Sequence, residues 1–178
     1  GAAPGNARPQ GRTLLRFWAV DYKCDVWLNG AKLGEHEGGE APFTLDATAA
    51  VRPEAANLLA VRVLNPTHEP IDGVVLNETP HRNKALPYGP GSAWNQGGII
   101  DSVEILLVPA VRVADIFAAP DWKTGEIHVR AALDNASGHE VPYRLDLLAA
   151  PAAGGTPSST LRLERTLKAG ESTVEARL

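Results

Sequence analysis

The stretch Leu14–Asp46, LLRFWAVDYKCDVWLNGAKLGEHEGGEAPFTLD, decides the fold that the sequence predicts. Apolar and polar residues alternate around Leu15 and Phe17, which is typical of a strand with one buried face. A second short apolar run leads into Asn29-Gly30. This dipeptide is the strongest short signal for a β-hairpin, because both central positions of a type I′ turn need a positive φ. The sequence therefore predicts a hairpin over residues 25–33 with Asn29-Gly30 at its tip.

Two side chains of this stretch are expected in the core of the hairpin region. Trp27 lies between Val26 and Leu28, and the sequence predicts that its ring is buried. Cys24 is the one cysteine of the chain, so no internal disulfide can form. We expect Cys24 to act as a small apolar residue of its strand.

The rest of the chain continues the β pattern, and no segment longer than about one turn has a helical period. Turn residues separate short alternating segments at the spacing of an all-β sandwich. Strands are expected at residues 13–20, 43–45, 58–64, 99–108, 111–118, 127–133, 143–149, 161–167 and 173–178.

Composition excludes several classes of protein. The chain has 178 residues, of which 44% are hydrophobic and 21% charged, with a formal net charge of -4. These values argue against disorder and against a nucleic-acid partner. No apolar run approaches the roughly 18 residues that cross a membrane. Residues 1–11 are expected to form a flexible tail without a signal peptide, so either the chain is intracellular or its leader precedes these residues. A secreted or periplasmic location is slightly favoured over a cytoplasmic one.

Several short motifs in a fixed order resemble the sugar-binding domain at the N-terminus of family-two glycoside hydrolases. That family includes β-galactosidases, β-mannosidases and β-glucuronidases. The resemblance covers about ninety residues, and it is the order and spacing of the motifs that make it specific. The motifs are Val20-Asp21, Val26-Trp27-Leu28-Asn29-Gly30, Leu33-Gly34, His36-Glu37-Gly38-Gly39, Pro42-Phe43, Asp46, residues 57–63 and residues 94–103.

The resemblance implies two all-β domains that meet near Pro109. Residues 12–109 would form a jelly roll whose first strands are missing, and residues 110–178 an immunoglobulin-like sandwich that is short for its type. In the family, a TIM barrel follows these domains and supplies the catalytic carboxylates. This sequence has no run of alternating strands and helices, so no catalytic residue is expected in it.

An acidic loop is the alternative source of carboxylates. Glu35, Glu37 and Glu40 occur in one glycine-rich segment and could cluster. We interpret them as a solvated loop, because nothing in the sequence supplies the different environments that separate the pKa values of an acid and a base.

No metal or cofactor is expected. The five histidines, His36, His68, His81, His128 and His139, form no ligand spacing with carboxylates on a rigid element. His128 is expected on the polar face of its strand. The resemblance adds one point, since some β-galactosidases bind a cation with help from an aspartate at the position of Ser92, which carries no charge here.

The long segment over residues 65–98 is the candidate sugar-binding site. Sugars are bound by aromatic rings and by hydrogen-bonding side chains, and this segment offers both. Trp94 has a structural alternative as a packing residue, and the cluster at 81–84 has one as a solvated surface. The candidate ligand-binding residues are His81, Arg82, Asn83, Trp94, Asn95 and Gln96.

Three hypotheses for function follow. The first is a non-catalytic sugar-binding or scaffold part of a hydrolase of terminal β-glycosides, with carbohydrate and a TIM-barrel domain of its own chain as partners and with scope for a homo-oligomer. The second is a self-standing carbohydrate-binding module, and the third is a cell-surface structural or adhesion protein without sugar affinity. Two glycosylation patterns begin at Asn77 and Asn135, and the alanine-rich, bacterial composition makes us interpret both as incidental.

Overall fold

The computed structural model describes residues 11–67, 69–75 and 97–178, and its strands confirm the all-β prediction. No helix occurs among the residues described. All the strand pairs whose register is defined are antiparallel. The strands are β1 (Gly11–Phe17), β2 (Val20–Asp21), β3 (Lys23–Leu28), β4 (Ala31–Glu37), β5 (Phe43–Asp46), β6 (Leu59–Leu64), β7 (Gly98–Ile99), β8 (Val103–Pro109), β9 (Val111–Pro120), β10 (Ile127–Asn135), β11 (Val141–Ala149), β12 (Ser159–Leu167) and β13 (Gly170–Arg177).

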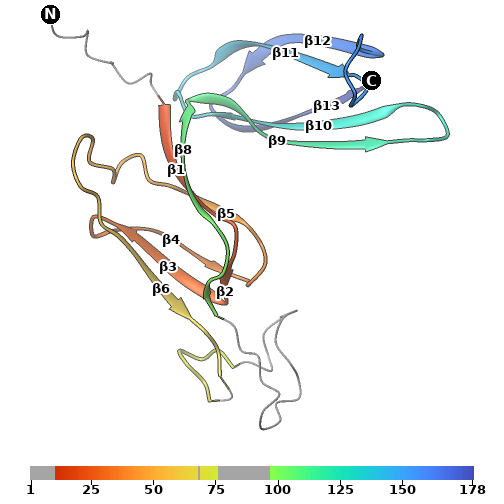
Figure 1. Cartoon of the computed structure of the whole chain (residues 1–178). Helices are drawn as coiled ribbons and strands as arrows, with labels where there is room; N and C mark the ends of the chain where they lie inside the picture. Colours follow the sequence, from red (N-terminus) through yellow and green to blue (C-terminus); the bar gives the residue numbers. More distant parts are fainter. Residues whose placement is uncertain (1–10, 68, 76–96) are drawn as a thin grey trace, which may run out of the picture. The chain divides into compact units, whose positions relative to one another are not determined.

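The chain divides into two compact units, Arg12–Val108 and Pro109–Leu178 (Figure 1). The first unit contains the sheets β5-β1-β8 and β4-β3-β6 and the short pair β2-β7. The second contains the sheets β13-β10-β9 and β11-β12. Each unit has its own hydrophobic cluster, so each is built around its own core.

The hairpin predicted around Asn29-Gly30 is confirmed. Leu28 pairs with Ala31 across the turn, and Asn29 and Gly30 have φ values of 53° and 86°. A β-bulge between Val26 and Trp27 then shifts the register, so that Val26 lies opposite Gly34. A Cβ atom at Gly34 would lie 2.8 Å from a methyl group of Leu45, so a larger residue here would displace the Leu45 side chain.

The core of the first unit forms on the inner faces of β1 and β3. Phe17, Cys24 and Val26 are fully buried there, which confirms the expectation for Cys24. The Phe17 ring stacks on Phe43 with a centroid distance of 5.0 Å, and Phe43 stacks on His36 at 4.2 Å. An aromatic column therefore joins β1, β5 and β4.

The prediction that Trp27 is buried is wrong. Its side chain is only half-buried. Since successive residues of a strand point to opposite faces, the burial of Val26 and Leu28 turns Trp27 outward. On that face its ring lies 6.0 Å from the Lys32 ammonium group, within the range of a cation–π interaction.

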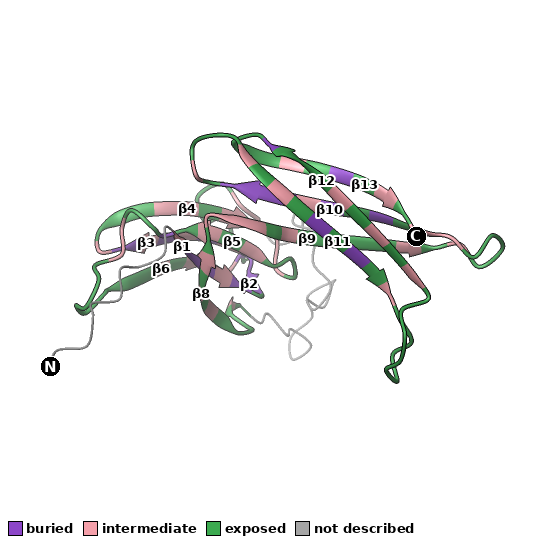
Figure 2. Ribbon diagram, turned by 90° about the horizontal axis from the view of Figure 1, so that it is seen from above, coloured by how far each residue is buried: buried purple, intermediate pink, exposed green. Residues whose placement is uncertain are grey.

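The second unit packs its two sheets face to face. The core-facing residues are aliphatic and come from both layers, with Val129, Ala131 and Leu133 of β10 against Leu145 and Leu147 of β11. Figure 2 shows the burial alternating along these strands, as expected for strands with one core face and one outer face.

One expected strand is divided in two. The sequence predicts a continuous strand over residues 99–108, but the structure has β7 and β8 with a break between them. The Ile100 amide donates to the Ala19 carbonyl, and the Trp18 amide donates to the Ser102 carbonyl. The chain changes partners at this point, because β7 pairs with β2 whereas β8 lies beside β1.

Candidate functional site

The six candidate sugar-binding residues, 81–83 and 94–96, lie outside the described residues. The structure describes residues 69–75, which come just before this segment in the chain. A tight turn at Asp72-Gly73, closed by hydrogen bonds between Ile71 and Val74, ends just before residue 76. The candidate site is therefore described from the residues around this turn.

A hollow of about 200 Å³ lies beside that turn, on the outer side of the β4-β3-β6 sheet. Cys24 and Val26 of β3 point into the core, so the alternating residues Lys23 and Asp25 point outward. Register places Asp25 opposite Glu35 on β4 and opposite Arg62 on β6. The lining residues are Lys23, Asp25, Glu35, Arg62, Leu64, Asp72 and Val74.

Asp25 is the centre of an ion-pair network in this hollow. Its carboxylate accepts from Lys32 Nζ at 2.7 Å and lies 3.4 Å from Arg62 Nη1. Lys32 also contacts Glu35 at 2.9 Å, and Arg62 also pairs with Asp72. Arg62 therefore connects the strand β6 to the turn that precedes residues 76–96.

This network keeps Asp25 ionised. The hydrogen bond from Lys32 lowers the pKa of the Asp25 carboxyl below its ordinary value, with a further contribution from Arg62. The same bond raises the pKa of Lys32, and Asp72 raises that of Arg62. A carboxyl with a lowered pKa has no proton to donate near neutral pH, so Asp25 is unsuited to the general-acid step of glycoside hydrolysis. The hollow can instead offer charged hydrogen-bond donors and acceptors to hydroxyl groups.

Glu35 and Glu37 belong to β4 and not to the loop that the sequence predicts, and both are engaged with other side chains. Glu35 pairs with Lys32, while Glu37 accepts a hydrogen bond of 2.9 Å from the Tyr22 hydroxyl and lies 3.6 Å from Lys23 Nζ. Burial, followed by the bond and charge of Glu37, raises the pKa of Tyr22 to about 12. Glu37 therefore has a structural role in holding a buried tyrosine.

Asn135, the first residue of one glycosylation pattern, is a structural residue. It is buried, and its side-chain amide donates to the carbonyls of His139, Leu167 and Lys168. Its oxygen accepts from the backbone and hydroxyl groups of Ser137. The burial and bonding of this amide agree with the interpretation of the pattern as incidental. Asn77 lies outside the described residues.

Within residues 11–67, 69–75 and 97–178, no cluster of three or more His, Cys, Asp or Glu side chains could hold a metal ion. His128 faces outward on β10, as expected. No helix in the described part of the chain has the length and apolar character to span a membrane.

Sequence reasoning missed the roles of Arg62 and Asp72. Both occur in segments whose pattern indicates only a strand and a turn. The contact of Arg62 with Asp25 depends on β6 pairing with β3, which alternation alone does not reveal, and Asp72 joins the network through Arg62.

Comparison with curated proteins gives relatives among glycoside hydrolases. A mannosylglycoprotein endo-β-mannosidase from Lilium longiflorum is 26% identical over 148 residues, which are 75% of this chain and 16% of the relative. A β-glucuronidase from Rattus norvegicus is 28% identical over 121 residues, which are 62% of this chain and 18% of the relative. The chain thus spans less than a fifth of the length of these relatives.

Solved structures show the same fold. A putative β-galactosidase from Bacteroides fragilis superposes with a TM-score of 0.73 at 20% identity, over 96% of this chain and 25% of that one. A β-glucuronidase from Bacteroides uniformis gives 0.70 at 22% identity, over 100% of this chain and 20% of that one. Residues 4–109 match the family described as glycosyl hydrolases family 2, sugar binding domain. More than half of the chain lies within this match, and the chain therefore belongs to that family.

Proposed function

We propose that this chain is a non-catalytic, sugar-contacting part of a glycoside hydrolase that acts on terminal β-glycosides. The observation that carries the proposal is the match of residues 4–109 to a sugar-binding domain, in a chain that covers about a fifth of its relatives. Carbohydrate is the proposed partner, together with a catalytic TIM barrel in the same polypeptide.

The proposed architecture is a jelly roll over residues 12–109 followed by an immunoglobulin-like sandwich over 110–178. The division into Arg12–Val108 and Pro109–Leu178 supports it. So does the three-stranded sheet β13-β10-β9 packed on β11-β12, since immunoglobulin-like domains are two antiparallel sheets packed around one core.

The proposal that this chain is non-catalytic rests on the chemistry of its carboxyl groups. Glycoside hydrolysis normally needs one carboxyl group held protonated and a second held ionised across the scissile bond. Asp25 is held ionised, and Glu35 and Glu37 are paired with Lys32 and Tyr22. We therefore expect the purified 178-residue chain to leave aryl β-glycosides intact.

We propose sugar contacts at residues 81–83 and 94–96, and a further set of contacts at the charged hollow of β3 and β6. Affinity should be weak, roughly millimolar, because a single open protein face covers little of a sugar ring. The hollow supplies donors on Lys23 and Arg62 and acceptors on Asp25 and Asp72, which match the hydroxyl groups of a pyranose.

The test is a two-dimensional NMR titration of the full chain with galactose, mannose and glucuronic acid. We expect shifts at 81–96 and at the amides that line the hollow, and we expect Trp94→Ala to abolish them. Trp122→Ala is the matched control, because Trp122 is a largely exposed tryptophan in the other unit.

The outcomes distinguish the loop site from a purely structural role and from a catalytic one. Shifts that survive Trp94→Ala would remove the loop site, and no shifts at roughly 50 mM sugar, well above a millimolar Kd, would favour a purely structural role. Turnover of an aryl β-glycoside that Glu35→Gln or Glu37→Gln abolishes would overturn the non-catalytic assignment.

A further inference from the structure

A second hollow lies within the second unit, on the outer face of the β13-β10-β9 sheet. Val129 and Ala131 of β10 point into the core, so His128 and Arg130 point outward. Register places Arg130 between Phe117 of β9 and Glu175 of β13. Three neighbouring strands therefore present one row of side chains to the outside.

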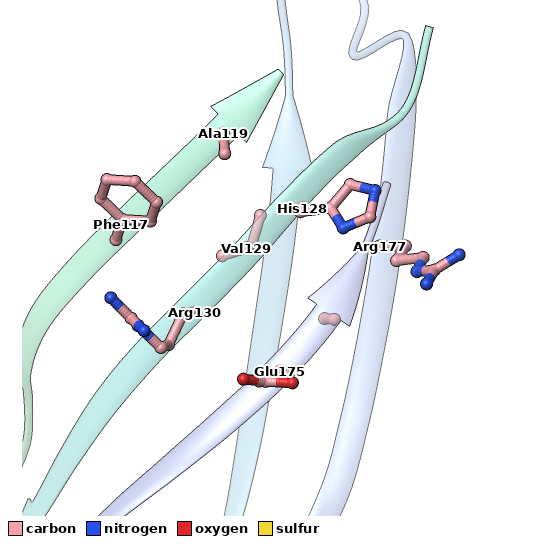
Figure 3. Close-up of a pocket in the computed structure, with 8 residues that line it drawn as sticks. Phe117, Ala119, His128, Val129, Arg130, Glu175 and Arg177 are labelled. Carbon is pink, nitrogen blue, oxygen red and sulfur yellow. The ribbon is translucent and has the colours of Figure 1, made fainter. Parts of the chain in front are cut away.

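The next row of residues on the same face of the sheet also lines the hollow. His128 lies between Ala119 of β9 and Arg177 of β13. Ala119 has a short side chain among longer ones, and in Figure 3 Phe117 and His128 lie on either side of it, with Arg130 and Arg177 farther away on β10 and β13. The hollow has a volume of about 320 Å³. This lies at the lower end of the roughly 300–1,000 Å³ of small-molecule sites, so it suits a ligand of about one ring.

One donor and one acceptor in the hollow are not engaged in ion pairs. The Arg130 guanidinium lies 5.4 Å from the centroid of the Phe117 ring, in a cation–π contact. Neither Arg130 nor Glu175 forms an ion pair with another residue that the structure describes. In Figure 3, Arg130 extends toward Phe117 and Glu175 lies apart from it on β13.

Glu126, at the rim of the hollow, lies close to its two other basic side chains, His128 and Arg177. Its carboxylate lies 3.4 Å from His128 Nε2 and 3.7 Å from Arg177 Nη1. The hollow and its rim thus combine two guanidinium groups with two carboxylates. An anion would meet Glu126 and Glu175, and a cation would meet Arg130 and Arg177, so the charge balance favours an uncharged ligand.

We propose that this hollow is a binding site for a neutral saccharide. An apolar C–H face of the sugar packs on the exposed part of the Phe117 ring, which is 55% exposed. The guanidinium of Arg130 donates to ring hydroxyls, and the carboxylate of Glu175 accepts from them, each as a charge-assisted hydrogen bond. The site lies wholly in the second unit and goes beyond the loop site proposed above; neither site needs the other.

The experiment is an NMR titration of the 178-residue chain with methyl β-D-glucopyranoside and, separately, with glucuronic acid. With the neutral glycoside we expect shifts at the amides of residues 117–119, 128–130 and 175–177, with a roughly millimolar Kd. Phe117→Ala should weaken binding about tenfold through the lost ring contact, and Glu175→Gln should weaken it several-fold. The matched controls are Trp122→Ala and Glu164→Gln, an exposed aromatic and an exposed acid outside the hollow.

The outcomes decide between the two sites. Shifts confined to 81–96 would support the loop site and overturn this one, whereas shifts confined to β9, β10 and β13 would do the reverse. Stronger shifts with glucuronic acid would overturn the selectivity for a neutral ring. Equal loss of binding in Trp122→Ala and Phe117→Ala would also overturn the site, provided that each variant keeps the dispersed spectrum of the parent.

Discussion

The two units differ in how completely each closes its core. In Arg12–Val108, residues such as Phe17, Val20 and Val26 have no exposed surface, and aromatic rings stack at the centre. In Pro109–Leu178 the core is aliphatic, and most of its members keep a few per cent of exposed surface. A closed aromatic centre and an open aliphatic one thus occur in a single all-β chain.

Sheet size explains the openness of the second unit. A sheet of three strands faces a sheet of two, so part of the larger sheet has no layer opposite. Register gives Val113 and Ile116 of β9 the same face as Leu133 and Ala131, yet they are 43% and 53% exposed. Among the described residues of the first unit, Ile105 and Leu107 of the edge strand β8 are 69% and 79% exposed. Alternation therefore identifies a core face but does not reveal whether another layer covers it.

The largest expected effect is the loss of an aromatic ring from the closed core. Phe17→Ala should destabilise the first unit by about 4 kcal/mol, because it leaves a cavity and removes the stack with Phe43. Leu133→Ala in the second unit should cost about 2–3 kcal/mol, near the low end for Leu→Ala, because a partly open core can relax around the gap. Amide hydrogen exchange, followed residue by residue, measures each unit separately.

Trp18→Ala is the control for that comparison, since Trp18 is 40% exposed next to Phe17 in the sequence. It should change protection by less than about 1 kcal/mol. An equal loss of protection in Phe17→Ala and Trp18→Ala would contradict the closed core. A larger loss in Leu133→Ala than in Phe17→Ala would reverse the ranking of the two units.

The second prediction compares two asparagines with similar bonds and different burial. Asn135 is buried and bonds three carbonyls, whereas Asn57 is exposed and bonds the backbone of Arg52 and Ala55 and the side chain of Asn29. Asn135→Ala should cost about 3 kcal/mol, because it leaves the buried Leu167 carbonyl and two partly buried carbonyls without this donor. Asn57→Ala should cost about 1 kcal/mol, because water replaces the lost partners. Chemical denaturation with both variants measures the difference, and equal costs would contradict the role of burial.

Much of the fold could be predicted from local patterns. Asn29-Gly30 identified its hairpin because the requirement for positive φ belongs to the turn itself. Trp27 was placed on the wrong face because its large apolar ring was given more weight than the alternation set by Val26 and Leu28. The break between β7 and β8 was not predicted, because it results from a change of pairing partner rather than from the sequence between them.

The sites could be predicted less well. Residues 81–83 and 94–96 were selected by residue type, which is a local property, and they remain a prediction. The hollow of the second unit joins Phe117, Arg130 and Glu175, which lie far apart in the sequence and meet through strand register. Periodicity showed that His128 faces outward, but the neighbours across the sheet depend on strand order. Sequence reasoning therefore found single side chains of this hollow and not the hollow.

The smallest expected effect concerns one carboxylate in each unit. Lys32 lowers the pKa of Asp25 in the first unit, and Arg162 lowers that of Asp146 in the second. A carboxyl whose pKa is lower in the folded chain stabilises it above the unfolded pKa, near 3.8, and this stabilisation is lost as the pH falls through the folded value. Asp25→Asn should therefore lower the Tm at neutral pH, and the difference from the parent should begin to shrink as the pH falls below about 3.8. The Asp25 side chain is 16% exposed and that of Asp146 35%, so Asp146→Asn should show the weaker effect and the greater loss of it at high salt. A Tm difference that stays constant from pH 7 to pH 3 would mean that these substitutions act through packing and not through charge.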